Sequence, residues 1–210
     1  YLNSLCKNLK KIGININTIP VLDVLRNNTS KVISNRSFSN KKEIVKKLGR
    51  VTVDQCHTNK IITVIKHIPG HGCAISDSHY KMPKVNSSYK ELNSNDFYPF
   101  KSNSAKLAMT AHILYQKIDP INVATFSKEI IEKTIRKKIG FKGILMSDDI
   151  SMKALKFDLV TNAKKSLDAG CNLVLYCAGN IHDNFKLIKS VPYIDKFTRK
   201  KTSEIYNILR

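Results

Sequence analysis

The sequence predicts an α/β fold of the (β/α)₈-barrel type, in which parallel strands alternate with helices. Three observations lead to this prediction. Short apolar runs recur along the chain, stretches with helical periodicity separate them, and residues able to do chemistry follow the ends of the apolar runs. Barrels of this type keep their active sites at those strand ends. Only five strands are visible, so we expect an incomplete barrel of about five βα units.

Each predicted strand is short, rich in apolar or β-branched residues, and ends in polar residues. The five segments are Ile14 to Val24, Ile61 to Lys66, Leu107 to His112, Ile144 to Asp148 and Leu173 to Cys177. No internal repeat, low-complexity tract or domain boundary interrupts this pattern. Residues 1–210 are therefore predicted to form a single catalytic domain.

Two segments between the strands have helical periodicity. In the first, Asn40 is expected to open a helix with apolar positions at Ile44, Val45, Leu48 and Val51. In the second, Ser127 is the expected N-cap and Gly140 the end of a helix with apolar positions at Ile130, Ile131, Ile135 and Ile139. Residues 85–100 are polar, with a proline near the end, which predicts a loop leading into a short helix.

Residues 66–79, KHIPGHGCAISDSH, contain three histidines, an aspartate and a lysine around a Pro-Gly and a second glycine. Lys66 and His67 fall at the C-terminal end of a predicted strand, where the loop begins. The proline and glycines exclude a helix, so these histidines cannot share a helical face as those of a zinc-binding HExxH motif do. This composition indicates a catalytic loop.

Within this loop, Asp77 precedes His79 by two residues. A turn can bring the carboxylate to one ring nitrogen of the histidine and leave the other nitrogen free. A paired carboxylate fixes the tautomer and raises the basicity of a histidine, which titrates near neutral pH. The pair is a candidate proton donor. The alternative interpretation of His79 is a solvated loop side chain.

A second polar group ends the predicted strand in GILMSDDISM, residues 143–152. Adjacent strand residues point to opposite sides, so one of Asp148 and Asp149 is expected to face the barrel mouth and the other a neighbouring loop or helix cap. The alternative is an acidic surface pair that caps the next helix. A carboxylate here, with a histidine from another strand end, would supply the nucleophile and proton donor of a displacement.

Six sequence blocks follow one another along nearly the whole chain. They are IPVLDV at 19–24, ISNRSF at 33–38, KHIPGHGCAISDSH at 66–79, MTAHILY at 109–115, GFKGILMSDDISM at 140–152 and LDAGCNLVLYC at 167–177. Blocks of this kind in this order resemble glycoside hydrolase family 3. The resemblance is closest to the bacterial β-N-acetylglucosaminidases of that family.

The resemblance implies roles for individual residues. Asp148 would be the nucleophile, His79 the general acid/base and Asp77 the partner of His79. Sugar hydroxyls would be held by Lys66, His67 and Arg36. The implied reaction is retaining hydrolysis of a terminal, non-reducing β-linked N-acetylglucosamine through a covalent glycosyl-enzyme that water then releases. No cofactor and no metal are expected.

In the subfamily that the chain resembles, the substrate is usually a peptidoglycan fragment cleaved during cell-wall recycling in the cytoplasm. Its barrels carry three further strands before the IPVLDV block, and a loop there supplies an aspartate and an arginine that grip the sugar. The chain begins at Tyr1, without an initiator methionine. We therefore expect it to be the C-terminal part of a longer barrel, poorly folded and inactive when expressed alone.

The formal net charge of +20 suggests nucleic-acid binding, but the kind of basic residue argues against a specific site. Only 6 of the 36 basic residues are arginines, and the lysines are scattered among asparagines and isoleucines. Proteins that read a nucleic-acid sequence rely on bidentate arginines and interleaved aromatic residues. We predict no specific nucleic-acid partner, only non-specific polyanion binding at low salt.

The five cysteines are odd in number and include no CxxC pair, which favours a reducing compartment over a disulfide framework. Cys73 lies in the predicted catalytic loop and is a candidate reactive thiol. Cys171 and Cys177 flank an apolar run and are expected to be small core residues. No apolar run reaches the roughly 18 residues that a membrane span needs, so no membrane partner is predicted.

Three alternatives stay open from the sequence alone. A neutral imidazole does not repel an anionic acceptor, so phosphate could replace water and give a phosphorylase. A metal-dependent hydrolase would use His67, His71, His79 and Asp77 as ligands, although the Pro-Gly loop matches no usual ligand spacing. The third alternative is a catalytically inactive remnant of the family. Every catalytic position expected in this segment carries the expected residue, which argues against that alternative.

Overall fold

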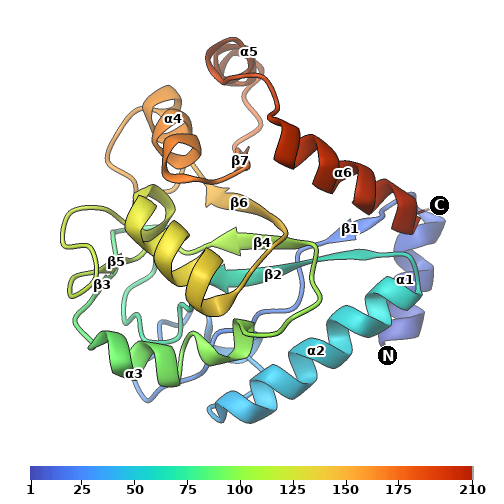
Figure 1. Ribbon diagram of the computed structural model, residues 1–210, viewed down its shortest axis with the longest axis horizontal. Helices are drawn as coiled ribbons and strands as arrows, with labels where there is room; N and C mark the ends of the chain where they lie inside the picture. The colour runs from blue at the N-terminus through green and yellow to red at the C-terminus, as the bar shows by residue number, and fades with distance from the viewer. Residues whose placement is uncertain (210) are drawn as a thin grey trace.

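The computed structural model describes residues 1–209 and is built around a five-stranded parallel sheet (Figure 1). The strands, in their spatial order, are β1 (Ile16–Asn17), β2 (Ile62–Ile68), β4 (Leu107–Thr110), β6 (Ile144–Asp149) and β7 (Leu173–Leu175). Every neighbouring pair is parallel and follows the chain order, as successive βα crossovers produce. The predicted number of strands and the α/β class are confirmed.

Helices connect the strands and cover both faces of the sheet (Figure 1). They are α1 (Leu2–Lys11), α2 (Lys42–Thr58), α3 (Tyr89–Ser94), the π-helix η4 (Ile130–Ile139), α4 (Leu159–Ala169), α5 (Ile181–Ser190) and α6 (Lys196–Leu209). Three single 3₁₀ turns occur at η1 (Ser34–Arg36), η2 (Tyr98–Phe100) and η3 (Ala124–Phe126). Two short strands, β3 (Lys84–Val85) and β5 (Leu114–Tyr115), form a second parallel pair. None of the described helices is long and apolar enough to cross a membrane.

The helix predicted after Ser127 is confirmed, including both of its ends. The Ser127 hydroxyl accepts the amide of Ile130 at 3.1 Å, and Gly140 ends the helix in the left-handed conformation, with φ of +80°. The four predicted isoleucines are all buried. That the segment winds as a π-helix was not predicted from its sequence.

The helix predicted from Asn40 begins two residues later, at Lys42, and its N-cap position, Lys41, makes no side-chain cap. The hydroxyl of Ser39, not the Asn40 side chain, accepts the amide just before the helix, that of Lys41, at 3.1 Å. Its buried face was also misjudged. Of the four predicted apolar positions only Val45 is buried, and the helix packs mainly through small residues such as Gly49 and Thr52. Small residues let a helix lie close to its neighbour, so they carry the contact here instead of the large ones.

The strand predicted over Ile14 to Val24 is mostly irregular. Regular pairing stops after two residues, and beyond Pro20, which lacks an amide hydrogen, the chain follows β2 through a single bridge between Val21 and Lys66. β4 and β7 each end two residues earlier than predicted, whereas β2 continues for two residues past Lys66. Cys171 is buried as expected, but Cys177, beyond the end of β7, is exposed.

The sheet separates two apolar layers. On one face Ile65, Ala108 and Leu145 belong to the main core together with residues of α2 and η4. On the other face a second cluster, Ile62, Val64, Leu107, Met109 and Ile144, packs against Ile205 of α6. The helix α6 thus covers a face that the five strands alone would leave open to water (Figure 1).

We expect Ile205→Ala to lower the free energy of unfolding by roughly 2 to 5 kcal/mol, the range for truncating a buried isoleucine. Ile205 is 6% exposed, and its neighbour Tyr206 is 61% exposed, which makes Tyr206→Ala a matched control with a much smaller effect. Urea unfolding of the two variants measures the difference. Equal losses would mean that α6 does not seal the sheet through Ile205.

Candidate active site

Charged and polar side chains gather where β2, β4 and β6 end. Near Asp148, at the end of β6, lie Lys66 and His67 from β2 and His112, two residues beyond β4. Three of the six site residues predicted from the sequence, Asp148, Lys66 and His67, are therefore brought together. The C-terminal edge of the sheet is the candidate active site.

Both strands that carry these residues are irregular at the site. The pairing of β2 with β4 shifts register at His67, and that of β6 with β7 shifts within residues 146–149, which include Asp148. A bulge bends its strand and re-aims the side chain at that point. The predicted site residues His67 and Asp148 thus lie where the regular strand pairing, and with it the alternation of side chains between the two faces of the sheet, is interrupted.

The two adjacent aspartates of β6 separate as predicted. Asp149 turns toward β7, where its carboxylate accepts the amides of Ser151 at 3.0 Å and Cys177 at 3.1 Å. Asp148 instead accepts only the amide of Asp149, at 2.8 Å, among the hydrogen bonds of the described residues. Asp149 is thus engaged in holding two loops, and Asp148 is available for chemistry.

The surroundings of Asp148 favour its ionised form. Partial burial alone would raise the pKa of Asp148, but His67, His112, the Asp149 amide and Lys66 outweigh it and hold that pKa below its ordinary value. An ionised carboxylate at neutral pH is the form that a nucleophile needs.

His112 supports the backbone beside Asp148, a role that sequence reasoning missed although the MTAHILY block contains it. Its Nε2 lies 3.1 Å from the carbonyl oxygen of Asp149, and since a carbonyl only accepts, Nε2 carries the hydrogen. Its Nδ1 then accepts from the hydroxyl of Thr125, at 2.7 Å. Burial lowers the pKa of His112, which agrees with this neutral tautomer.

Lys66 and Arg36 lie on the β1 side of the site. Both line a cavity of about 700 Å³ whose wall also includes Pro20 and Val21. Burial lowers the pKa of Lys66, and the nearby positive charge of Arg36 lowers it further. Arg36 comes from the turn η1, where it donates to the carbonyl of Val32 at 3.0 Å. The rest of the wall is mostly apolar, with Leu5, Phe38 and Leu48 among its residues, and Asp148 does not line this cavity.

Asp77 and His79 pair as predicted, on an exposed part of the loop. Asp77 Oδ1 accepts both the backbone amide of His79 at 2.9 Å and its Nδ1 at 2.8 Å. Slight burial alone would raise the pKa of Asp77, but the two hydrogen bonds outweigh burial and hold that pKa below its ordinary value. The His79 side chain is 55% exposed. No hydrogen bond or ion pair among residues 1–209 joins this pair to Asp148, so the structure forms the pair but leaves it apart from the carboxylate.

A second aspartate–histidine pair, which the sequence did not reveal, lies beneath the site. Asp23 is fully buried, and its carboxylate accepts Nδ1 of His67 at 2.7 Å and the backbone amide of His71 at 2.6 Å. The IPVLDV block contains Asp23, but nothing in its spacing indicated a partner more than 40 residues away.

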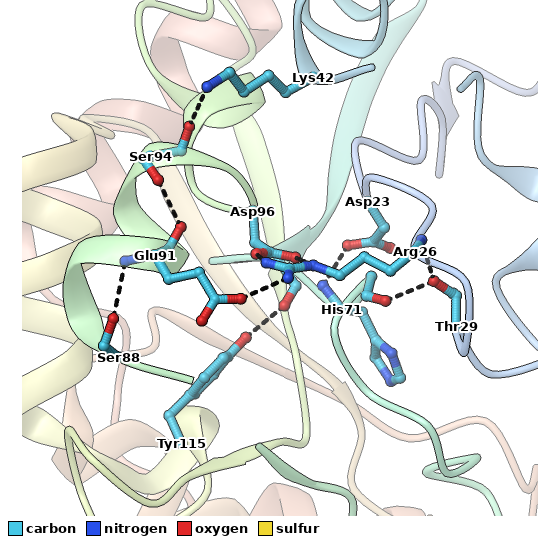
Figure 2. Close-up of polar contacts among 12 residues, drawn as sticks. Asp23, Arg26, Thr29, Lys42, His71, Ser88, Glu91, Ser94, Asp96 and Tyr115 are labelled. Atoms are coloured by element: carbon cyan, nitrogen blue, oxygen red, sulfur yellow. Dashed lines mark hydrogen bonds and ion pairs between the residues drawn. The ribbon is translucent and has the colours of Figure 1, made fainter. Parts of the chain in front are cut away.

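The loop that carries His71 is fixed from behind by a polar network (Figure 2). Arg26, three residues after Asp23, forms ion pairs with the buried Asp96 and with Glu91 of α3. The hydroxyl of Tyr115 donates to the carbonyl of Gly70 at 2.5 Å. The Tyr115 bond holds the start of the loop to β5, and the Arg26 ion pairs join the segment after Asp23 to α3 and to Asp96.

Close backbone packing also constrains this loop. A Cβ atom at Gly72 would lie 1.8 Å from the carbonyl oxygen of Val24, so only glycine fits. The carbonyl of Gly72 in turn accepts the hydroxyl of Thr29 at 2.6 Å. The loop and the segment after Asp23 thus touch through their backbones.

The metal-ligand set considered from the sequence is not assembled. Asp77 pairs with His79 on the exposed loop, whereas His67 pairs with Asp23 in the interior. Within residues 1–209, no three histidine, cysteine, aspartate or glutamate side chains are grouped so as to hold a metal ion. Cys73 is largely buried, and burial raises the pKa of its thiol well above the ordinary value, which argues against a reactive thiolate.

A buried, ionised carboxylate and histidine–carboxylate pairs at the strand ends of a parallel α/β sheet are typical of barrel hydrolases that use a nucleophile and a proton donor. Comparison with known sequences specifies the family. The Glycosyl hydrolase family 3 N terminal domain matches residues 3–201. The chain therefore belongs to glycosyl hydrolase family 3, and its sheet is part of the barrel of that domain.

Individual relatives agree with this assignment. A β-hexosaminidase of Actinobacillus succinogenes is 34% identical over 195 residues, which cover 88% of this chain and 56% of that protein. A β-hexosaminidase of Haemophilus influenzae is 32% identical, covering 87% and 54%. The chain spans about half the length of the curated relatives it matches.

Solved structures have the same arrangement of elements. NagZ of Neisseria gonorrhoeae in complex with N-trifluoroacetyl-D-glucosamine superimposes with a TM-score of 0.85 at 29% identity, covering 96% of this chain and 58% of that one. A family 3 β-N-acetylglucosaminidase of Paenibacillus gives 0.86 at 27% identity, covering 99% and 42%. The prediction of an incomplete barrel is confirmed.

We expect Tyr115→Phe to lower the free energy of unfolding by about 1 to 3 kcal/mol, because it leaves the Gly70 carbonyl without its buried donor. Hydrogen exchange should also rise in the loop that follows Gly70. Tyr80→Phe, at a 73% exposed position of the same loop, is the control and should change neither quantity. Unchanged exchange after Tyr115→Phe would show that this bond does not anchor the loop.

Proposed function

We propose that this chain carries the catalytic residues of a β-N-acetylhexosaminidase that removes terminal, non-reducing β-linked N-acetylglucosamine with retention of configuration. The observation that carries the proposal is Asp148, a carboxylate held ionised between His67, His112 and Lys66 at the strand ends of a family 3 barrel. Relatives named β-hexosaminidase, and a solved NagZ bound to N-trifluoroacetyl-D-glucosamine, support the sugar.

In the proposed reaction, Asp148 attacks the anomeric carbon and forms a covalent glycosyl-enzyme. His79 protonates the leaving oxygen, then removes a proton from the water that releases the sugar. Asp77 suits this role because its bond to Nδ1 leaves Nε2 of His79 free for the substrate. The exposure of His79 lets it reach a leaving group at the mouth of the site.

Lys66, His67 and Arg36 are the proposed sugar ligands. The charges of Lys66 and Arg36 interact with each other, and Lys66 and His67 both interact with Asp148, which supports a place for these residues near the nucleophile. We further propose peptidoglycan fragments as the substrate and the cytoplasm as the place of cleavage, on the strength of the resemblance to the bacterial cell-wall recycling enzymes of the family.

The proposal predicts that, in the complete protein with the upstream part of its barrel, Asp148→Asn removes nearly all cleavage of an aryl β-N-acetylglucosaminide while the protein stays folded. Loss of the covalent route costs at least about 4 kcal/mol of barrier, on the order of a 1,000-fold loss in kcat. Asp149→Asn is the control and should lose much less, because that carboxylate faces Ser151 and Cys177.

A fluorosugar that traps the glycosyl-enzyme should label Asp148 in the unmodified protein. Label on Asp149, or equal inactivation of both variants, would contradict the assignment. Analysis of the released sugar in phosphate buffer also separates hydrolysis from phosphorolysis, because a phosphorylase yields the sugar 1-phosphate.

We expect the effect of His79→Ala to depend on the leaving group. Cleavage of a sugar aglycone, which needs a proton, should fall severely, whereas glycosylation by an activated phenol should fall only mildly. Added azide should partly restore turnover of the glycosyl-enzyme. The same loss for every leaving group, without rescue, would make His79 a binding or structural residue.

A further inference from the structure

We propose that Asp23 is a positioning residue that acts through His67: its buried carboxylate fixes the His67 tautomer and directs the opposite ring nitrogen of His67 toward the sugar. This inference rests on the proposed function for its catalytic consequence. The pairing of the two side chains can be tested independently of any activity.

The geometry around Asp23 is unusually complete for a carboxylate without access to water. One oxygen accepts the His71 amide at 2.6 Å, and the other accepts Nδ1 of His67 at 2.7 Å. The His67 amide lies 3.2 and 3.3 Å from the two oxygens. Two consecutive parts of the 66–79 loop are thus held by one side chain from the segment after β1.

The charge state of Asp23 decides which tautomer His67 adopts. Burial alone would raise the pKa of Asp23, but its interaction with His67 and the hydrogen bond from the His71 amide outweigh burial and lower that pKa. An ionised carboxylate can only accept, so Nδ1 of His67 must carry a hydrogen. In the neutral ring Nε2 is then an acceptor, available to a sugar hydroxyl.

The surroundings of His67 leave Asp23 as the group that sets its orientation. The ring is 5% exposed and makes an edge contact with the ring of His71, at 5.5 Å between centroids. Neither ring nitrogen of His71 has a hydrogen-bond partner in the described structure, and burial lowers the pKa of His71 to about 4. His71 therefore packs against His67 as a neutral ring and offers it no competing hydrogen bond.

Replacing Asp23 by asparagine would disturb these hydrogen bonds while keeping nearly the same side-chain volume. The amide has one accepting oxygen where the carboxylate has two, while the His71 amide and Nδ1–H of His67 both need an acceptor. Either the His71 amide loses its partner or His67 changes to the Nε2–H tautomer. The latter corresponds to the wrong-tautomer effect of removing the carboxylate from a catalytic triad.

The matched control is Asp96→Asn. Asp96 is equally buried, but its carboxylate pairs with Arg26 and, among the described residues, bonds to no histidine (Figure 2). It should lower thermal stability at least as much as Asp23→Asn does. It should leave the protonation of the His67 ring unchanged.

The first measurement is ¹⁵N NMR of the histidine rings in the full chain at neutral pH. We expect a protonated Nδ1 at His67 in the unmodified protein and in Asp96→Asn, and a changed tautomer or exchange between tautomers in Asp23→Asn. An unprotonated Nδ1 at His67 in the unmodified protein would overturn the proposal, and this result needs no variant to fold.

The second measurement is a double-mutant cycle on aryl β-N-acetylglucosaminide cleavage. Asp23→Asn should lower kcat/KM roughly 100-fold, the effect of misplacing a binding group by about 1 Å. In a His67→Ala background it should add little, because Asp23 acts through His67. Losses that multiply would overturn the proposal. If the complete protein, with the upstream part of its barrel, cleaves nothing, the proposed function fails, while the NMR result still decides whether Asp23 sets the tautomer of His67.

Discussion

The burial of the Asp23 carboxylate is the constraint on which the rest of the site depends. A carboxylate without water must be matched by hydrogen-bond donors, or it loses its charge. Here the donors come from His67 and His71, so the segment after β1 and the loop after β2 have to meet at one point. That meeting places Lys66 and His67 beside Asp148 and determines where the 66–79 loop can begin.

The two aspartate–histidine pairs differ in environment rather than in chemistry. Both join a carboxylate oxygen to Nδ1 over nearly the same distance, 2.7 Å in Asp23–His67 and 2.8 Å in Asp77–His79. The buried pair is surrounded by fixed partners and suits rigid positioning. The exposed pair is held through the turn that it forms, in which Asp77 accepts both the backbone amide and Nδ1 of His79. One loop thereby carries a rigid part and an adaptable part.

Much of this architecture could be predicted from the sequence, because local patterns control it. Apolar runs located the five strands, and the turn spacing of Asp77 and His79 predicted their bond. The partners of Asp23 and His112 could not be predicted, because they join residues far apart in the chain at bulged positions. The prediction of the buried face of α2 was wrong for a different reason. Small residues such as Gly49 are buried there, whereas the prediction from periodicity considered only large apolar residues.

The close contact of Gly72 with the backbone of Val24 divides the loop by how much change it can accept. A library that replaces Gly70 or Gly72 would mostly yield proteins in which the loop no longer fits the backbones of Asp96 and Val24. Ile75 is 69% exposed and follows the constrained part, so substitutions from Ile75 onward would leave the backbone contacts at the start of the loop unchanged. For an engineer who wishes to vary this loop, the usable half is the half nearer His79.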